Sequence, residues 1–400
     1  MIGKLAIVFL LLFLLGCVNT PNESNDRGNI PSGNSPATTN NSFNPDVPNQ
    51  PTSNGQPYNA GDTVGNTIEN CDNPIFTAYF VDPKYVQKVG QVGVVHGSGL
   101  YIVERSYVSV KIEFSGEKIP VYAPVDLTLR SGSHYQNPAA SNTALPDYAL
   151  WFDAGCGVEV NLAHLKEVVD PIAKQLLQVK TDSRSSQLTP ITFRAGDIIG
   201  HFIHNEGDVA GFDFIVRDKK VINEFINPER YSGNRASNLL NGVCPYDYYE
   251  SEKKQEYYNL LGGGGGTLFT VKDCGRSSRD VIGTISGMWF LDKEPQENIY
   301  DGYKDGDYGS TLSIVGDEER ITIGNLGPNP TSWVYPTNPT YTLPEKVIDE
   351  HCYQIDGYNP SQNAGWVYIK LISSTEARVS YSPTGTCPDS FPESSKVYYK

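Results

Sequence analysis

The sequence predicts an all-β protein with two folded β domains, and three observations lead to this prediction. Short runs rich in Val, Ile, Phe and Tyr follow one another, separated by Gly, Pro, Asp or Ser. The chain contains 25 Tyr and only 2 Met, which is typical of half-buried β surfaces and not of helical cores. Its 38 Gly and 27 Pro are close to average usage for 400 residues, so the chain as a whole is globular.

Residues 1–16 are predicted to form a signal peptide. Lys4 precedes an apolar run of eleven residues, Leu5 to Leu15, which is too short to cross a hydrocarbon core of about 30 Å. Leu14, Leu15, Gly16 and Cys17 resemble the lipobox of prokaryotic lipoproteins, which implies cleavage before Cys17 and its modification by a palmitate-type lipid. The alternative is an ordinary secretory signal with an incidental Cys17. We expect an extracytoplasmic protein of the cell envelope, anchored in a lipid bilayer through Cys17.

Residues 17–66 are predicted to form a disordered tether. The segment is rich in Asn, Pro, Ser, Thr and Gly, and Phe43 and Tyr58 are its only aromatic residues. Such a composition cannot bury enough apolar surface to offset the entropy lost on ordering. A flexible coil of this length reaches roughly 35 to 42 Å, so the tether holds the folded part away from the lipid surface.

Residues 67–225 are predicted to form the first β domain, with antiparallel strands that close into a sandwich or barrel. The expected strands are 92–95, 107–114, 120–129, 148–152, 158–162, 191–193, 198–203 and 212–216. One helix is expected over 164–178, because Leu165, Val168, Val169, Ile172 and Leu176 recur at helical spacing. Pro171 is expected to kink or divide that helix.

Three segments of this domain carry a family resemblance. Val121-Tyr122-Ala123-Pro124-Val125-Asp126, Glu159-Val160-Asn161-Leu162-Ala163-His164-Leu165 and Ala195-Gly196-Asp197-Ile198-Ile199-Gly200 occur in this order. Together they resemble the strand and turn motifs of the lysostaphin-type (LytM-like) zinc metallopeptidases, which cut peptide cross-bridges in cell walls. The resemblance covers about residues 90 to 220. It implies the duplicated hybrid-motif β fold of that family.

The resemblance also implies candidate site residues. His96 matches the first zinc ligand of the family, while Leu100 replaces the second ligand, an Asp. Asp213 replaces a ligand His, and Gly211 replaces a catalytic His. His164 is the one family His kept in context, and it would be catalytic only in an active enzyme. A hydrolytic zinc needs three protein ligands and an open position, so the set is incomplete.

A non-catalytic module is therefore the main interpretation, with no cofactor expected. The alternative is a zinc endopeptidase with a rearranged metal site, to which His201 and His204 could contribute. On one strand, however, residues three apart point to opposite faces, so these two cannot ligate one ion without a turn between them. For His164, the structural alternative is a half-buried histidine at the end of a strand.

Residues 226–280 are predicted to form a Tyr- and Gly-rich linker. An acidic Tyr cluster spans Asp247 to Tyr258, and five glycines follow, Gly262 to Gly266. The glycines lack the Lys and Ser or Thr that a phosphate-binding loop requires. Packing against a neighbouring domain is expected for the Tyr residues, and a sugar-stacking surface is the alternative.

Residues 281–400 are predicted to form a small antiparallel β-barrel of calycin type. Strands are expected over 283–290, 311–315, 320–323, 352–355, 366–372 and 377–381, and a short helix over 344–350. Gly287-Met288-Trp289 resembles the Gly-x-Trp start of lipocalin strands, in which the Trp closes one end of the core. Asp301, Asp305 and Asp307 depart from the EF-hand spacing and are expected to form an exposed acidic turn, with a Ca²⁺ site as the alternative.

The cysteines predict a disulfide framework. With Cys17 lipidated, six cysteines remain in an exported chain, and they allow 15 connectivities. Sequence proximity favours Cys244–Cys274 and Cys352–Cys387, which leaves Cys71–Cys156. A structural zinc site is the alternative, but no Cys-x-x-Cys pair is present.

Charge narrows the range of partners. The chain carries 31 basic and 46 acidic residues, a net charge of −15, and no long Lys/Arg run. Nucleic acid is therefore excluded as an expected partner, because phosphate contacts need a basic surface. We expect a membrane-anchored lipoprotein whose peptidase-like module binds an extracytoplasmic polymer, peptide or protein, or acts in envelope assembly.

Overall fold

The fold was analysed in a computed structural model that describes residues 71–96, 101–137, 145–204, 211–231, 237–262, 273–293, 311–316, 320–326, 329–356 and 365–400. Strands dominate this part of the chain, which confirms the predicted fold class. The signal peptide, Cys17, the tether and the acidic turn at Asp301, Asp305 and Asp307 lie outside the described residues.

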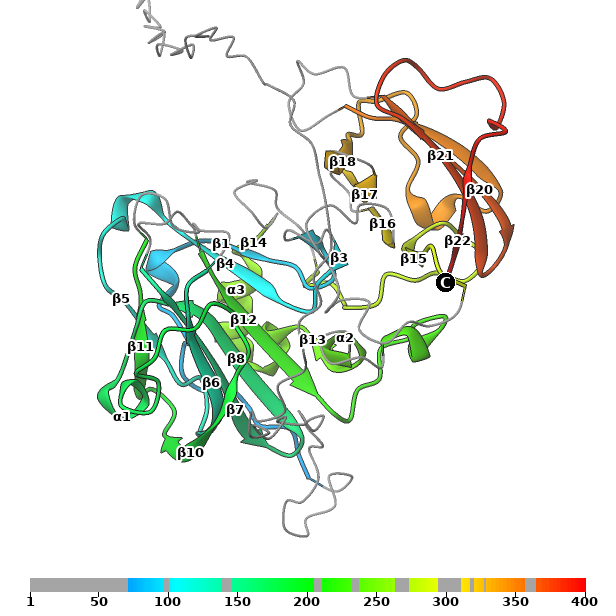
Figure 1. The fold of residues 1–400 in the computed structure, drawn as a ribbon. Helices are drawn as coiled ribbons and strands as arrows, with labels where there is room; N and C mark the ends of the chain where they lie inside the picture. Colours follow the sequence, from blue (N-terminus) through cyan, green and yellow to red (C-terminus); the bar gives the residue numbers. More distant parts are fainter. Residues whose placement is uncertain are drawn as a thin grey trace, which may run out of the picture. The chain divides into compact units, whose positions relative to one another are not determined.

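The first β region is built on a nine-stranded sheet with the order β10-β6-β7-β8-β12-β4-β1-β14, with β13 paired to β12 (Figure 1). Its strands are β1 (Val86–Gly90), β4 (Ser106–Val110), β6 (Leu127–Tyr135), β7 (Asp147–Gly155), β8 (Val158–Leu165), β10 (Ser186–Phe193), β12 (Gly211–Asp218), β13 (Gly242–Val243) and β14 (Leu261–Gly262). All pairs are antiparallel except β1 with β14.

A second, three-stranded sheet packs on one face of the first and makes a sandwich. It contains β5 (Ile119–Tyr122), β11 (Ile198–Phe202) and β9 (Glu167–Val168) in the order β5-β11-β9. Alternate residues of both sheets, such as Val121, Phe202, Leu162 and Phe214, are fully buried in one apolar core. Two short strands, β2 (Val95–His96) and β3 (Tyr101–Ile102), pair with each other.

Several predicted elements of this region are corrected. The expected strand 120–129 is two strands, β5 and β6, and the expected strand 92–95 is reduced to β2. The helix expected over 164–178 is wrong: β8 continues to Leu165, β9 follows, and only α1 (Asp170–Ala173) is helical. Leu165, Ile172 and Leu176 are still buried together, because strand pairing and one helical turn direct them into the same core.

The described part of the expected linker packs into this same core. It contains α2 (Ser237–Asn241) and α3 (Ser251–Tyr258), so the described part of the chain has three α-helices and not one. Tyr246, Tyr249 and Tyr257 are buried with Phe76 and Phe80, so packing, and not sugar stacking, is the role of these tyrosines. The burial of these large aromatic rings stabilises the core, so this segment is part of the first β region and not a flexible linker. Gly263 to Gly266 lie outside the described residues.

The second β region is one eight-stranded antiparallel sheet with the order β18-β17-β16-β15-β22-β21-β20-β19. Its strands are β15 (Gly287–Phe290), β16 (Thr311–Gly316), β17 (Ile321–Leu326), β18 (Asn329–Val334), β19 (Glu350–Gln354), β20 (Trp366–Ser373), β21 (Glu376–Ser382) and β22 (Lys396–Tyr399). Strands β18 and β22 were not predicted. The Asp356 amide donates to Trp333 O at 2.9 Å beside the two end strands, which nearly closes the sheet into a barrel.

The barrel interior is filled with side chains. Trp289 is fully buried among Ile, Val and Leu residues of the surrounding strands, and its Nε1 donates to Ile285 O at 2.9 Å. Gly287 has φ +114°, and a Cβ there would lie 1.9 Å from Asp280 Oδ1. The Gly-x-Trp segment thus serves packing. The helix expected over 344–350 is one 3-10 turn, η6 (Pro344–Lys346). Four further 3-10 turns are η2 (Pro83–Tyr85), η3 (Ile112–Phe114), η4 (Pro228–Tyr231) and η5 (Pro245–Tyr248).

Three disulfides join Cys71 to Cys156, Cys244 to Cys274 and Cys352 to Cys387, which confirms the two pairs favoured by sequence proximity and the pair that remained. Cys244 and Cys274 are part of the first apolar core. Within the described ranges, no helix has the length and apolar character required to span a bilayer.

Candidate functional site

The three motifs that carry the family resemblance lie beside one another. The Gly196 amide donates to Ala123 O at 2.8 Å, and the Ala123 amide donates to Asp197 O at 2.9 Å. The Ala195 amide donates to Asp126 Oδ1 at 2.9 Å. Strand β8, which carries the motif that includes His164, pairs with β12. The Lys166 amide donates to His201 O on β11 at 2.9 Å. The sandwich thus brings together segments up to about eighty residues apart in sequence.

His164 occupies an unusual backbone position at the end of β8. Its φ is +67°, one of two positive values among non-glycine residues in the described part of the chain. The β7–β8 register shifts between Tyr148, which pairs with Leu165, and Ala149, which pairs with Ala163, so His164 is the extra residue of a β-bulge. A left-handed conformation costs about 1 to 2 kcal/mol for a residue with a Cβ. This strain is sustained by the contacts of the imidazole ring.

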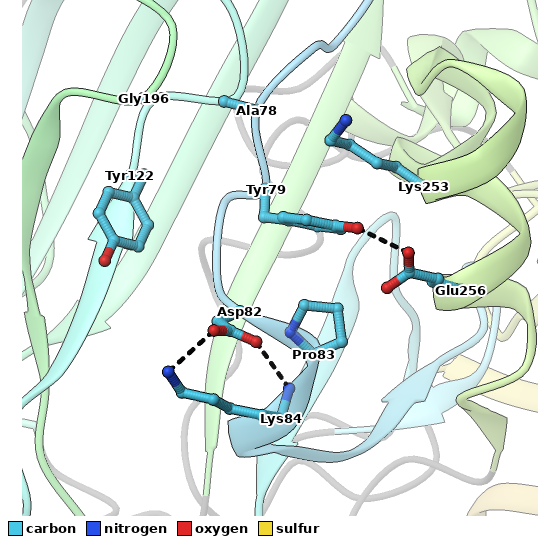
Figure 2. A pocket seen from close by; sticks show the side chains of 9 residues that line it. All are labelled: Ala78, Tyr79, Asp82, Pro83, Lys84, Tyr122, Gly196, Lys253 and Glu256. Atoms are coloured by element: carbon cyan, nitrogen blue, oxygen red, sulfur yellow. Dashed lines mark hydrogen bonds and ion pairs between the residues drawn. The ribbon is translucent and has the colours of Figure 1, made fainter.

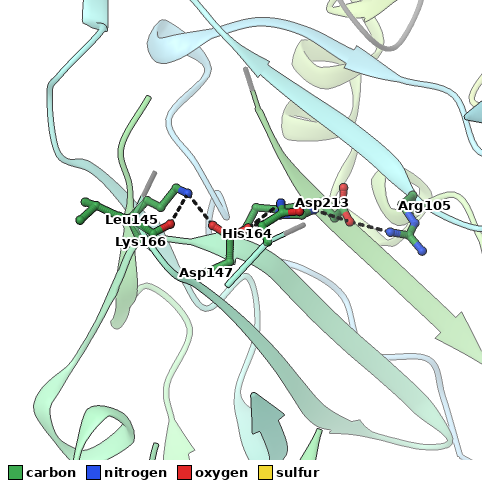
Figure 3. Close-up of polar contacts among 7 residues, drawn as sticks. Arg105, Leu145, Asp147, His164, Lys166 and Asp213 are labelled. Atoms are coloured by element: carbon green, nitrogen blue, oxygen red, sulfur yellow. Dashed lines mark hydrogen bonds and ion pairs between the residues drawn. The ribbon is translucent and has the colours of Figure 1, made fainter. Parts of the chain in front are cut away.

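The His164 ring is the centre of an alternating chain of charges, shown in Figure 3, in which Lys166, Asp147, His164, Asp213 and Arg105 follow one another. We call these five residues the charge chain. His164 Nδ1 lies 2.7 Å from Asp147 Oδ2, and Nε2 lies 3.5 Å from Asp213 Oδ2. Lys166 Nζ is 2.5 Å from Asp147 Oδ1, and Arg105 Nη1 is 2.8 Å from Asp213 Oδ2. Four strands, or the residues beside them, supply the five side chains.

Burial makes the charge chain strongly coupled. The side chains of Asp147 and Lys166 are fully buried, Asp213 is 1% exposed, and the His164 ring is 19% exposed. Lys166 also donates to Leu145 O at 3.0 Å, and Asn137 Nδ2 donates to Asp147 Oδ2 at 2.9 Å. Charges removed from water in this way are tolerated when each is paired and hydrogen-bonded.

The pairing sets the protonation states. Burial alone would lower the pKa of His164, but the carboxylates of Asp213 and Asp147 outweigh it and raise that pKa to about 9. Burial alone would raise the pKa of Asp213, but Arg105 and His164 lower it to about 2. The pKa of Asp147 is also lowered, because His164 and Lys166 outweigh burial. At neutral pH the charge chain therefore holds three cations and two anions.

The described residues do not fit a three-ligand zinc site. Asp213 Oδ2 is paired with two protein cations, Arg105 and His164, and both His164 nitrogens face carboxylates. A side chain at Gly211 has no room, because its Cβ would lie 2.3 Å from Val108 O on the paired strand. No group of three His, Cys, Asp or Glu side chains within the described ranges could hold a metal ion.

The remaining predicted ligands are placed as follows. The backbone of His96 lies in β2, but its side chain and Leu100 lie outside the described residues, so the role of His96 stays a prediction. His201 Nδ1 is 3.8 Å from Glu167 Oε2. His204 Nδ1 is buried and has no hydrogen-bond partner among the described residues. Among the described residues, neither histidine forms a hydrogen bond or an ion pair with Asp213 or His164.

Sequence reasoning missed Asp147, Lys166 and Arg105. Only part of a signal for the first two was present, because the expected strands 148–152 and 158–162 do form one hairpin. The bulge at His164, which sets Tyr148 opposite Leu165 and brings Asp147 to Lys166, could not be read from the sequence. No comparable signal identifies Arg105, because it reaches Asp213 only through the pairing of β4 with β12, about a hundred residues apart in sequence.

Comparisons with known proteins identify no family. No family model and no curated protein matches the chain. Among solved structures, the chain is similar to the NMR solution structure of lysostaphin at 14% sequence identity, with a TM-score of 0.20. That similarity covers 62% of this chain and 86% of the other. A TM-score this low does not establish a shared fold.

Proposed function

We propose that this chain is a lipid-anchored protein of the cell envelope whose first β region is non-catalytic and acts in binding or in envelope assembly. The observation that carries the proposal is the pairing of Asp213 Oδ2 with Arg105, 2.8 Å away, and with His164. These internal cations neutralise the carboxylate that an enzyme would use for a metal ion. Export and anchoring rest on the apolar run from Leu5 to Leu15 and on Cys17.

Two further observations support a non-catalytic module. The ring of His164 is occupied on both nitrogens, so it is not poised to exchange a proton with a substrate. The backbone closes over position 211, so a second histidine cannot be accommodated there without a shift of β4 or β12. Both features favour a rigid, non-catalytic module over an active enzyme.

The second candidate function is a zinc-dependent endopeptidase with a rearranged site. One observation favours it: Asp213 Oδ1 is buried and has no hydrogen-bond partner among the described residues. A buried carboxylate oxygen without a donor is unfavourable, and a cation would satisfy it. In this alternative His96 and Asp213 would be ligands and His164 would act on the substrate.

Incubation of the mature protein with cross-linked cell-wall peptides, with and without prior dialysis against zinc, distinguishes the two functions. We expect no hydrolysis above the buffer rate in either state, and co-sedimentation of the intact protein with insoluble envelope polymer. Zinc-dependent hydrolysis that is lost in His164→Asn would instead assign the endopeptidase. If the protein neither hydrolyses nor co-sediments, the polymer-binding part of the proposal is wrong.

A further inference from the structure

A pocket of about 540 Å³ opens on the first β region and shares no lining residue with the charge chain (Figure 2). Its walls come from three parts of the chain that pack on the same apolar core. These are the segment around Tyr79 and Lys84, the strand end at Tyr122 with Gly196 beside it, and the helix α3 with Lys253 and Glu256. Its volume falls within the range of about 300 to 1,000 Å³ that small-ligand sites occupy.

Two half-buried tyrosines form the aromatic part of the pocket. Figure 2 shows Tyr122 and Tyr79 on opposite sides of the pocket, with the Tyr79 ring extended toward α3 and its hydroxyl directed at Glu256. Lys253 Nζ lies 5.2 Å from the centre of the Tyr79 ring, and the Tyr79 hydroxyl donates to Glu256 Oε1 at 2.7 Å. These contacts hold the Tyr79 ring in one orientation, so its exposed surface is preformed.

The pocket offers polar groups with unused hydrogen-bonding capacity. The Tyr122 hydroxyl has no hydrogen-bond partner among the described residues, and Glu256 uses only Oε1. Burial and the Glu256 carboxylate raise the pKa of Tyr79 to about 12, so its hydroxyl remains a donor at any physiological pH. A ligand that fills this space must supply both donors and acceptors.

The charges of the pocket cancel. Asp82 pairs with Lys84 at 3.0 Å, Lys253 pairs with Glu250, the N-cap residue of the same helix, and Glu256 accepts the hydrogen bond from Tyr79. The lining contains two lysines and two acidic residues, so the pocket favours neither a strongly anionic nor a strongly cationic ligand. Neutral ligands with many hydroxyl groups and apolar C–H faces match aromatic rings and carboxylates best.

We infer that this pocket binds a neutral oligosaccharide, with separate sugar rings packed on Tyr122 and on Tyr79 and with hydroxyls bonded to Glu256 and Asp82. Sugar rings present C–H faces to aromatic side chains, while tyrosine adds a polar tip at the rim. The inference deepens the proposed binding function and rests on it for the kind of polymer that an envelope protein meets. A proline-rich peptide is the competing ligand class, because such peptides also dock on aromatic grooves.

Saturation-transfer NMR on the full mature chain tests the inference with chitotetraose, maltotetraose and cellotetraose as probes. We expect at least one of these saccharides to bind. Tyr122→Ala should weaken that binding about ten-fold, as expected for an aromatic residue at the centre of a site. Tyr122→Phe should retain part of the affinity, because it keeps the ring and removes only the hydroxyl.

Matched controls separate the pocket from general effects. Tyr148→Ala removes a half-buried tyrosine of the same region that stacks on His134 and does not line the pocket, so it should leave the affinity unchanged. Glu256→Gln should weaken binding, while Glu252→Gln on the exposed side of α3 should not. If Tyr122→Ala does not fold, Tyr122→Phe and Glu256→Gln still decide the question.

Three results would overturn the inference: no binding by any of the three saccharides, binding unchanged in Tyr122→Phe and Glu256→Gln alike, or binding of a proline-rich decapeptide that the saccharides do not displace. None of these results would imply catalysis, because catalysis is tested by the hydrolysis assay, which concerns the charge chain and not the pocket. Conversely, zinc-dependent hydrolysis would overturn the proposed function and leave the saccharide pocket standing.

Discussion

Arg105 neutralises the carboxylate of Asp213, which is almost completely removed from water. Loss of Arg105 should therefore lower the stability more than loss of a surface ion pair would. Arg105→Ala leaves Asp213 buried with only His164 as a counter-ion, and we expect the free energy of unfolding to fall by about 3 kcal/mol. Arg130→Ala is the matched control, because Arg130 pairs with Asp153 at the same 2.8 Å distance but their side chains are 39% and 32% exposed. It should lose less than about 1 kcal/mol.

Urea denaturation of both variants measures the difference. Equal losses for Arg105→Ala and Arg130→Ala would contradict the role of Arg105 as the counter-ion of a buried charge. The double variant Arg105→Met with Asp213→Asn should recover part of the stability lost in Arg105→Ala, because it removes both buried charges together.

His164 makes the stability depend on pH on the alkaline side. Its folded-state pKa of about 9 lies above the unfolded value of 6.5, so its stabilising effect is complete below pH 6.5 and is lost as the pH rises through 9. The full effect is at most about 3.5 kcal/mol, from a shift of about 2.5 pKa units at about 1.4 kcal/mol per unit. His164→Asn should abolish the decline between pH 6.5 and 9, because Asn does not titrate, and Asn also tolerates the positive φ of this position. Denaturation midpoints across this range test the point, and an unchanged decline in the variant would refute it.

At the residue scale, the sequence could reveal His164 and Asp213 but not the function of either. Both were singled out because their positions match a motif, yet motif spacing does not show what pairs with a side chain. Lys166, the partner of Asp147, belongs to a local hairpin. Arg105, the partner of Asp213, depends on a pairing between distant strands. Long-range pairing is set by the whole core, so local sequence does not encode it in a readable way.

At the level of elements, the pairing of β12 with β4 leaves no room for a side chain at position 211. Gly211 lies opposite Ser109, and a Cβ at position 211 would press on the backbone oxygen of Val108. We expect Gly211→Ala to lose about 2 to 3 kcal/mol of stability, because backbone must move to relieve the overlap. Thermal unfolding measures the loss.

Gly132→Ala is the control for Gly211→Ala. Its Cβ would meet Leu150 Cδ2 at 2.9 Å, the end of a side chain that can rotate away, so the loss should be nearer to 1 kcal/mol. A Gly211→Ala variant as stable as the wild type would show that the strands leave room for a side chain. The main structural argument against a histidine at this position would then fail.

Short strands bounded by Gly, Pro, Asp or Ser were predictable from the sequence. The change between strand and helical periodicity after His164 was not. The hairpin of β7 and β8 was expected from Tyr148 and Val158 onward. The helix expected from His164 was wrong, since Leu165, Ile172 and Leu176 occur at helical spacing by coincidence of a strand end, a turn and a single helical turn. Burial of the same residues is compatible with both periodicities, so pattern alone could not decide between them.

For the whole molecule, the proposed anchoring through Cys17 implies removal of residues 1–16, whose one charged side chain is Lys4. The net charge of −15 then becomes −16, and in the proposed arrangement it favours solubility of the folded part outside the membrane. We predict that Cys17→Ser abolishes labelling by a fatty-acid analogue and moves the protein from the membrane fraction to the soluble fraction. Ser42→Ala in the predicted tether should change neither property. Membrane retention of unlabelled Cys17→Ser would contradict lipid anchoring.

Zinc content of the purified mature chain tests the central claim most directly, because the claim is that protein cations and not a metal ion neutralise Asp213. Elemental analysis after dialysis against zinc and then against buffer should find well below one zinc per chain, both in the wild type and in His96→Ala. One tightly held zinc per wild-type chain that is lost in His96→Ala and in Asp213→Ala would contradict the account.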